Sequence, residues 1–455
     1  MTSRVLPVIL IILGLIAVVY VLVPDGAAAL AVATILSLVA VAVLRWAVDD
    51  KALVTTLFCA ALAARLTFGL FVHIADLREF FGGDANTYDF FGYQLFLRWT
   101  GAVRLPDPTV EYALQSVTNA WGMYHLVASI YYVVGRNILA AQSACGVIGA
   151  ATSPMVYMCA TLIFHNRKVA VRAAVLVALF PALIIWSGQL LKDGPIIFLL
   201  VLAITMILKL QEKFSIAAVG VLAAACAGIM SLRFYVFYMI IAAIAGGLVI
   251  GMSGSTKAVA RNAIIVLILG VALTYIGVSR NASNALDRFA NLAVIENSRQ
   301  DLATSAQSGF GADIDVSTTA GAISAVPVGL AYLFLAPFPW EVTSLRAAIT
   351  LPEVLLWWAM LPLLFTGILW SIRERFKRSF PILVFALLLS LAYSIFQGNV
   401  GTAYRQRTQI QTFAFIFIAV GWTLREERRE NKRIMDVKHL DPFSRNDRPQ
   451  PVQLA

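Results

Sequence analysis

Long uninterrupted apolar runs dominate the chain. Because a helix needs about 20 apolar residues to cross the hydrocarbon core of a bilayer, each run has roughly the length of a transmembrane helix. No run alternates apolar and polar residues as barrel strands do. The pattern predicts an all-α polytopic integral membrane protein with about 12 transmembrane helices, in a range of 11 to 14. The predicted spans are residues 5 to 23, 27 to 48, 52 to 75, 138 to 163, 170 to 190, 194 to 210, 215 to 231, 234 to 252, 263 to 279, 352 to 370, 380 to 396 and 409 to 424.

Two other apolar stretches, residues 121 to 134 and 323 to 340, are short or broken by proline. If neither crosses the membrane, every dense basic loop falls on one side, with 22 Lys and Arg against 10 Asp and Glu. The positive-inside rule makes that side the cytoplasm and places both termini there. The opposite, outer face then carries two long loops with short interfacial helices, residues 76 to 137 and 280 to 350.

Composition agrees with this pattern. The chain of 455 residues is 60% hydrophobic and only 13% charged, which excludes a soluble enzyme. Its net charge of +10 follows the loop asymmetry, so nucleic acid is not an expected partner. We expect a single transmembrane domain over residues 1 to 432 and a disordered cytoplasmic tail over residues 433 to 455, which are polar and contain proline.

The sequence offers no site for a resident metal or cofactor. Its four cysteines all lie in apolar runs, and its four histidines are scattered without the spacing of a ligand pair. Walker and dinucleotide-binding glycine motifs are both absent from the sequence. We therefore expect no metal site and no cofactor.

The first outer loop contains an acidic motif, Gly83-Asp84-Ala-Asn-Thr-Tyr88-Asp89, soon after the third predicted span. A carboxylate at a helix N-terminus is stabilised in its charged form by the helix dipole. Such a carboxylate is able to accept a proton from a hydroxyl group. Asp84 and Asp89 are therefore candidate catalytic residues, and Tyr88 is a candidate substrate-binding residue. The alternative is that Asp84 only caps the helix.

Arginines mark two further places at the outer face. The last outer turn contains Tyr404-Arg405-Gln-Arg407, and Arg233 lies at the end of an earlier span. Arginine beside a membrane is costly unless it meets an anion or an acidic partner, and its guanidinium fork binds phosphate bidentately. These residues are candidates to bind a substrate phosphate. The alternatives are extension of Arg405 and Arg407 to lipid headgroups and a structural salt bridge for Arg233.

The acidic motif resembles that of the GT-C superfamily of polytopic glycosyltransferases, which includes protein O-mannosyltransferases and aminoarabinose transferases. Those proteins place an acidic residue, often followed by a tyrosine, in the first outer loop. A second similar stretch runs from residue 141 to residue 191 and closes with Lys192-Asp193. The resemblance implies a second acidic residue at Asp193, which we expect to be catalytic. Lys192 adjoins it at the outer end of a span and is a candidate substrate-binding residue; the alternative for both charges is a structural salt bridge. The sequence departs from the superfamily in having Ala85 where many members have a second acid.

The resemblance covers residues 65 to 210 and implies an inverting glycosyltransferase. Its donor would be a sugar on a polyprenyl phosphate or diphosphate at the outer face of the inner membrane. Its acceptor would be a glycan, lipid or protein, in cell-envelope or exopolysaccharide assembly, where membrane lipids and other polysaccharide-assembly proteins are the expected partners. One alternative is an O-antigen-type polysaccharide polymerase. An alternative of another class is a lipid-carrier flippase or transporter.

Two features remain. Arg65 lies inside the third predicted span and needs a buried partner or a water-filled cavity.

The segment from Leu333 to Glu341 contains two prolines, which break helices. We expect this segment to lie bent at the outer interface with Trp340 as its anchor, the alternative being a kinked membrane helix.

Overall fold

The computed structural model describes residues 2–102, 108–115, 120–250, 264, 265, 268, 271, 291–304 and 308–440. This part of the chain is helical apart from turns and an isolated bridge between Gly309 and Asn399. Seven of its helices are long and apolar enough to cross a membrane, or eight if one bent pair counts as a single span. The chain is therefore an all-α membrane protein. The seven are α1 (Thr2–Leu22), α2 (Gly26–Ala47), α3 (Lys51–Ile74), α8 (Ile138–Phe164), α11 (Asp193–Glu212), α18 (Leu345–Glu374) and α19 (Phe376–Phe396).

Other predicted spans correspond to helices that are shorter or more polar than this. Residues 215 to 231 and 234 to 252 correspond to α12 (Ile216–Leu232) and α13 (Phe234–Ile250), and the last span lies within α20 (Val400–Leu440). The predicted span at residues 263 to 279 falls almost entirely outside the described residues. The total of twelve spans therefore stays a prediction.

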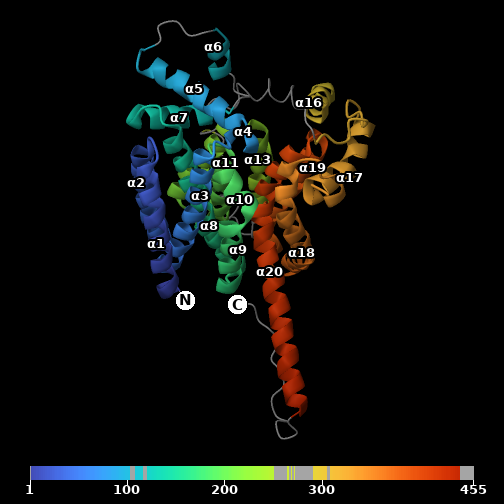
Figure 1. The fold of residues 1–455 in the computed structure, drawn as a ribbon. Helices are drawn as coiled ribbons and strands as arrows, with labels where there is room; N and C mark the ends of the chain where they lie inside the picture. Colours follow the sequence, from blue (N-terminus) through green and yellow to red (C-terminus); the bar gives the residue numbers. More distant parts are fainter. Residues whose placement is uncertain are drawn as a thin grey trace.

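The predicted loops contain short helices. The first holds α4 (Arg78–Phe81), α5 (Asp84–Trp99), α6 (Pro108–Gln115) and α7 (Trp121–Val134), and the second holds α16 (Leu292–Thr304) and α17 (Thr319–Leu335). Helices α5 and α7 lie across one end of the bundle, whereas α1 begins and α20 ends toward the other end (Figure 1).

Ion pairs join the basic turns at this second end of the bundle. Arg167 binds Asp50 at 2.7 Å, and Arg378 binds Glu212 at 2.9 Å. Arg172 of α9 pairs with Glu426 of α20. These contacts connect the turns before α3, between α8 and α9, after α11 and between α18 and α19. The basic turns therefore gather at one end, as the charge pattern predicts, and we call it the basic end.

A proline divides one span into two helices. Pro181 has no backbone N–H, so α9 (Arg167–Leu179) ends just before it and α10 (Pro181–Ser187) continues at an angle of 55°. The break leaves carbonyl groups near the end of α9 without their usual helical donors.

Arg65 of α3 donates hydrogen bonds to these carbonyl groups. Its Nη1 donates to the oxygen of Ala178 at 3.0 Å, and its Nη2 donates to the oxygen of Val177 at 3.3 Å. Its Nε donates to the hydroxyl of Ser187 at 2.7 Å. Arg65 is 1% exposed, so its predicted buried partner is the broken end of a helix and not an acidic side chain.

Side chains also donate hydrogen bonds to the carbonyl groups at the end of α17. Trp357 Nε1 donates to the oxygen of Phe334 at 2.8 Å, and Arg407 Nη1 donates to the oxygens of Phe334 and Ala336 at 3.1 and 3.0 Å. The chain then leaves the helix, forms a single turn, η1 (Pro339–Glu341), and leaves Trp340 75% exposed. The segment is thus bent after residue 335, as its prolines predict.

Helix α20 continues to Leu440, past the predicted start of a disordered tail at residue 433. Residues 433 to 440 are therefore helical in the structure, because the polar sequence after the last span continues the helix without a proline or glycine. Residues 441 to 455 lie outside the described part of the chain.

Candidate functional site

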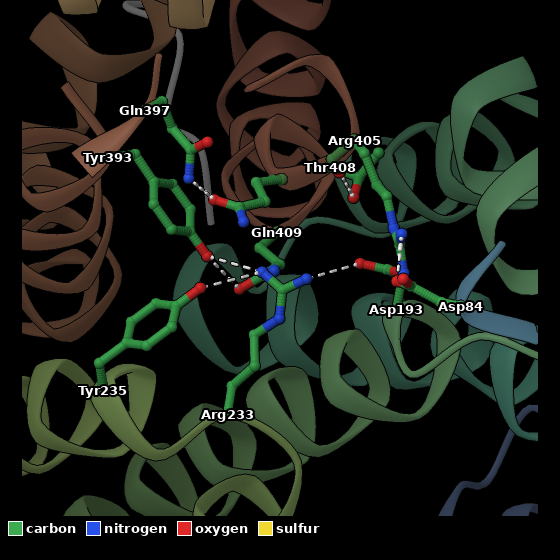
Figure 2. Close-up of polar contacts among 10 residues, drawn as sticks. Asp84, Asp193, Arg233, Tyr235, Tyr393, Gln397, Arg405, Thr408 and Gln409 are labelled. Carbon is green, nitrogen blue, oxygen red and sulfur yellow. Dashed lines mark hydrogen bonds and ion pairs between the residues drawn. The ribbon is translucent and has the colours of Figure 1, made fainter. Parts of the chain in front are cut away.

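The site is centred on Arg405, in the second turn of α20, at the end of the bundle opposite the basic end. Its Nη1 donates to Asp84 Oδ2 at 2.7 Å, and its Nε donates to Asp193 Oδ2 at 2.6 Å (Figure 2). Asp84 belongs to α5 and Asp193 to α11. One guanidinium group therefore connects three helices that are far apart in sequence.

A second arginine extends the cluster inward. Arg233, between α12 and α13, donates through Nη2 to Asp193 Oδ1 at 3.1 Å. Its Nη1 donates to the hydroxyls of Tyr393 at 3.1 Å and Tyr235 at 3.3 Å, and Tyr393 donates to Gln409 Oε1 at 3.1 Å (Figure 2). The result is a continuous chain of polar contacts from Asp84 to Gln409.

The four charged side chains of this chain differ in exposure. The Asp84 side chain is 50% exposed, that of Arg405 13%, that of Arg233 5% and that of Asp193 0%. Asp84 is thus the group that solvent reaches, while Asp193 is a buried carboxylate balanced by two arginines.

Local sequence explains how Asp84 reaches Arg405. Gly82 has a φ of +153°, which side chains rarely allow, and a Cβ there would lie 3.8 Å from Arg405 Nη1. Gly83 is the N-cap residue of α5 and Asp84 is the first residue of the helix, with no side-chain capping bond. The carboxylate therefore binds Arg405 and does not cap α5.

An aromatic side chain supports Arg405 from α10. The guanidinium carbon lies 5.5 Å from the ring centroid of Trp186, within the range of a cation–π interaction. Trp186 directly precedes Ser187, which Arg65 binds. The kinked span thereby places an indole against the central arginine of the site.

Two more of the predicted residues lie beside the cluster. Tyr88, one turn after Asp84 on α5, is buried and within electrostatic range of both arginines and both aspartates. Lys192 lies in the loop directly before Asp193. Burial and the charge of Arg233 lower the pKa of Lys192 to about 8. Within the described residues its ammonium group forms no ion pair or hydrogen bond.

Asp89 belongs to a different set of contacts. Its carboxylate accepts from Arg136 Nη2 at 2.6 Å and from the Tyr131 hydroxyl at 2.5 Å. The hydrogen bond to Asp89 raises the pKa of Arg136 above its ordinary value. These bonds fasten α5 to α7 and to the turn before α8, so the structure does not bring Asp89 together with the Arg405 cluster.

Arg407 and Tyr404 also bind other groups. Arg407 contacts the carbonyls after α17, as described above, and lies 5.0 Å from the Tyr404 ring centroid. The Tyr404 hydroxyl donates to Glu353 Oε2 of α18 at 2.6 Å. Residues 405 and 407 are two apart on a helix and face different neighbours. Of the two predicted phosphate-binding arginines, only Arg405 belongs to the cluster.

The sequence reasoning missed several participants. Trp186, Tyr393 and Gln409 contact the two arginines or their partners, and Glu353 holds Tyr404. A signal existed for Glu353, because an acid inside an apolar run marks a site or a buried partner. A second signal was the amide at position 409 at the start of the last apolar run. Tyr393 and Trp186 carry no such signal, since aromatic residues are common in spans.

The arrangement suits an anionic ligand that reaches the outer edge of the site. Three cations and two carboxylates leave a net charge of +1 when all are ionised: Arg405, Arg233 and Lys192 against Asp84 and Asp193. Both carboxylates are bound by arginine, and the described residues contain no group of three or more His, Cys, Asp and Glu side chains arranged for a metal ion.

No protein-family model matches the sequence, and no curated protein matches it significantly. The geometry of the site is therefore the basis for assigning a function.

Proposed function

We propose that this protein is a membrane glycosyltransferase of the GT-C type that transfers a sugar from a polyprenyl phosphate or diphosphate. The observation that carries the proposal is the sharing of Arg405 between the half-exposed Asp84 and the buried Asp193. A phosphate is able to replace Asp84 as a partner of this guanidinium group, because both are anions that accept its N–H bonds. Donor binding would then release Asp84 for chemistry.

The reaction follows from that exchange. The freed Asp84 carboxylate takes the proton of an acceptor hydroxyl, whose oxygen attacks the anomeric carbon. The bond from that carbon to the phosphate oxygen breaks, and its electron pair stays on the phosphate. Arg405 stabilises this developing charge, with Lys192 beside the site as a second cation. Attack from the face opposite the leaving phosphate inverts the anomeric carbon.

Other residues hold this geometry. Asp193 keeps Arg405 and Arg233 in place, and the Trp186 ring packs against the Arg405 guanidinium group. In this proposal Arg407, Tyr404 and Asp89 stabilise the fold around the site and do not contact the donor.

We further infer twelve spans with both termini in the cytoplasm, in an inner (plasma) membrane. The gathering of the basic turns at one end supports this orientation. The Arg405 cluster then lies at the outer face, where lipid-linked sugars of the cell envelope are consumed.

One observation favours a transporter instead, namely the broken span formed by α9 and α10. Transporters place such breaks in corresponding positions of two repeats and bind substrate near mid-membrane. Here α9 and α10 are the one bent pair among the described residues, and Arg65 fills the break. The charges of the Arg405 cluster lie at or near helix ends, and Arg65, the charge inside a span, is bound to backbone carbonyls and Ser187, so the enzyme is the better supported function.

The test is the profile of lipid-linked oligosaccharides and glycans in cells that carry either wild type or Asp84→Asn. We expect Asp84→Asn to abolish the glycan product and to accumulate a carrier-linked intermediate, because amide nitrogen cannot accept the acceptor proton. Mass spectrometry identifies the intermediate. A repeat unit on the carrier would indicate a polymerase, and a single sugar would indicate a transferase.

The matched control is Asp76→Asn, which changes a carboxylate of the same loop that is 86% exposed and, among the described residues, forms an ion pair with Arg78 alone. This variant should keep the wild-type profile. Identical profiles for wild type and Asp84→Asn, at equal amounts of membrane protein, would contradict the proposed function.

A further inference from the structure

Glu353 is a buried acid inside an apolar span, and the reaction proposed above does not use it. It lies in the third turn of α18, which packs against α20 (Figure 1). A charge in such a place is costly, so acids within membrane helices usually have a function and a definite partner. The partner here is the Tyr404 hydroxyl, which donates to Glu353 Oε2 at 2.6 Å. Because Tyr404 directly precedes Arg405, this hydrogen bond joins α18 to the turn of α20 that carries the central arginine of the site.

The Tyr404 ring also contacts the aromatic residue that supports Arg405. The rings of Tyr404 and Trp186 pack edge to face, with centroids 6.3 Å apart and an angle of 68° between their planes. The Trp186 centroid in turn lies 5.5 Å from the guanidinium carbon of Arg405. Edge-to-face and cation–π contacts both favour particular directions of the groups that form them. A continuous line of contacts therefore runs from Glu353 through these two rings to Arg405.

The line of contacts is buried and leaves the Tyr404 ring little freedom. Glu353, Tyr404 and Trp186 are 5%, 4% and 8% exposed. Besides its contacts with Glu353 and Trp186, the Tyr404 ring centroid lies 5.0 Å from the guanidinium carbon of Arg407. Arg407 also lies within electrostatic range of Glu353, whose charge it offsets. Such buried side chains are suited to hold a neighbouring group in a fixed direction and not to contact a substrate themselves.

The direction of the Arg405 guanidinium group matters in the proposed reaction. Stabilisation of the charge that develops on the leaving phosphate depends on N–H groups that already point at it. When a donor phosphate replaces Asp84, the described contacts that remain at the guanidinium group are those with Asp193 and with the Trp186 ring. Asp193 binds it through Nε, and the ring packs against it. Loss of the ring contact would therefore leave Arg405 held by one side chain.

We propose that Glu353 and Tyr404 are positioning residues, which fix the direction of the Arg405 guanidinium group through Trp186. This inference rests on the proposed function, since only the reaction makes that direction important. A misdirected guanidinium group keeps its charge and still attracts the donor phosphate, but it aligns poorly with the transition state. Loss of the hydrogen bond between Tyr404 and Glu353 should therefore lower kcat and leave the KM for the donor nearly unchanged.

The experiment compares Glu353→Gln with Glu353→Leu. Both variants remove the carboxylate charge, and glutamine and leucine are similar in size, but only glutamine accepts a hydrogen bond from the Tyr404 hydroxyl. The purified full-length proteins are assayed with the carrier-linked intermediate isolated from Asp84→Asn cells. We expect the kcat of Glu353→Leu to lie roughly tenfold below that of Glu353→Gln. The KM values of the two variants for this donor should agree within about twofold.

Tyr404→Phe provides a second arm, because it removes only the hydroxyl and keeps a ring against Trp186. Its kcat should fall as that of Glu353→Leu does. In the Tyr404→Phe background, Glu353→Gln and Glu353→Leu should have equal kcat values, since the hydrogen bond is already absent. The matched control is Tyr332→Phe, which removes a tyrosine hydroxyl bound to Glu341 Oε1 at 3.1 Å in the second outer loop. This control should keep the wild-type kcat.

A second readout needs no enzymatic activity. Fluorine NMR of protein labelled with fluorotryptophan reports the surroundings of each indole, and Trp186→Phe identifies the Trp186 resonance. We expect this resonance to differ between Glu353→Gln and Glu353→Leu and to be unchanged in Tyr332→Phe. Equal kcat values, or equal Trp186 resonances, for the glutamine and leucine variants would overturn the positioning role. Absence of sugar transfer by wild type would instead contradict the proposed function, and the resonance would still test the path from Glu353 to Trp186.

Discussion

Two buried arginines of this protein, Arg65 and Arg405, are stabilised by different kinds of hydrogen-bond acceptor. Arg65 meets backbone carbonyls and a hydroxyl, and no carboxylate is among its hydrogen-bond partners in the described structure. Arg405 meets two carboxylates, one buried and one half-exposed. Both lie within the helical bundle, where an unpaired guanidinium group is costly.

The difference separates a structural arginine from one that is able to exchange partners. The carbonyls around Arg65 are fixed by the helices that carry them, so its contacts persist. Asp84, in contrast, is half-exposed on Arg405, and in the proposed function a phosphate takes its place. The number and exposure of the acceptors therefore indicate function better than burial of the arginine does.

The largest expected effect is that of Asp193→Asn on stability. The variant leaves Arg405 and Arg233 without their buried counter-charge, which costs about 3–5 kcal/mol. Thermal unfolding in detergent measures the loss. If Asp193→Asn unfolds at the wild-type temperature, the buried carboxylate does not balance the two arginines, and the contrast with Arg65 disappears.

The next effect is that of Arg65→Gln. Removal of the guanidinium group leaves the carbonyls of Val177 and Ala178 without donors, at a cost of about 1–3 kcal/mol each. We expect a clear fall in the unfolding temperature and faster proteolysis near the α9–α10 break. The same change at Arg45, an exposed arginine, should have little effect. Similar behaviour of the two variants would refute the capping role.

A smaller effect concerns the charge of Lys192. Because its pKa is lowered to about 8, the ammonium group loses its proton as the pH rises through that value. We expect affinity for a polyprenyl monophosphate to fall there by roughly fivefold, the contribution of one cation near a phosphate. Lys192→Arg keeps its charge and should flatten the curve. A wild-type curve that is already flat would remove Lys192 from the site.

The smallest effect on stability is that of Asp84→Asn. The carboxylate is half-exposed, and exposed ion pairs contribute about 0–1 kcal/mol. Its unfolding temperature should therefore stay close to that of wild type even though product formation is lost. A large fall in the unfolding temperature would contradict this prediction. It would mean that Asp84, like Asp193, is needed for stability.

The sequence predicts the class of fold well, because apolar runs and loop charges depend on local composition. It also names Asp84, Asp193, Arg233 and Arg405 as candidates. It does not reveal that they meet, since Asp84 and Arg405 are 321 residues apart and only the packing of α5, α11 and α20 joins them.

Arg407 shows where local reasoning was incomplete. The sequence analysis placed both arginines in the last outer turn, between the spans predicted at residues 380 to 396 and 409 to 424, and gave them the same role. In the structure the helix begins at Val400, so Arg405 and Arg407 point to different neighbours. A helix boundary misplaced by a few residues thus changes the assignment of a side chain.

Helix α20 is long enough to extend beyond the helical bundle. Its 41 residues span about 60 Å, roughly twice the hydrocarbon thickness of a bilayer. Arg172 of α9 still pairs with Glu426, but residues 428 to 434 are exposed and the end of the helix stands clear of the bundle (Figure 1). A soluble domain fused in helical register at Leu440 would project into water at a fixed angle, which provides a marker for single-particle imaging of a protein that is otherwise mostly embedded.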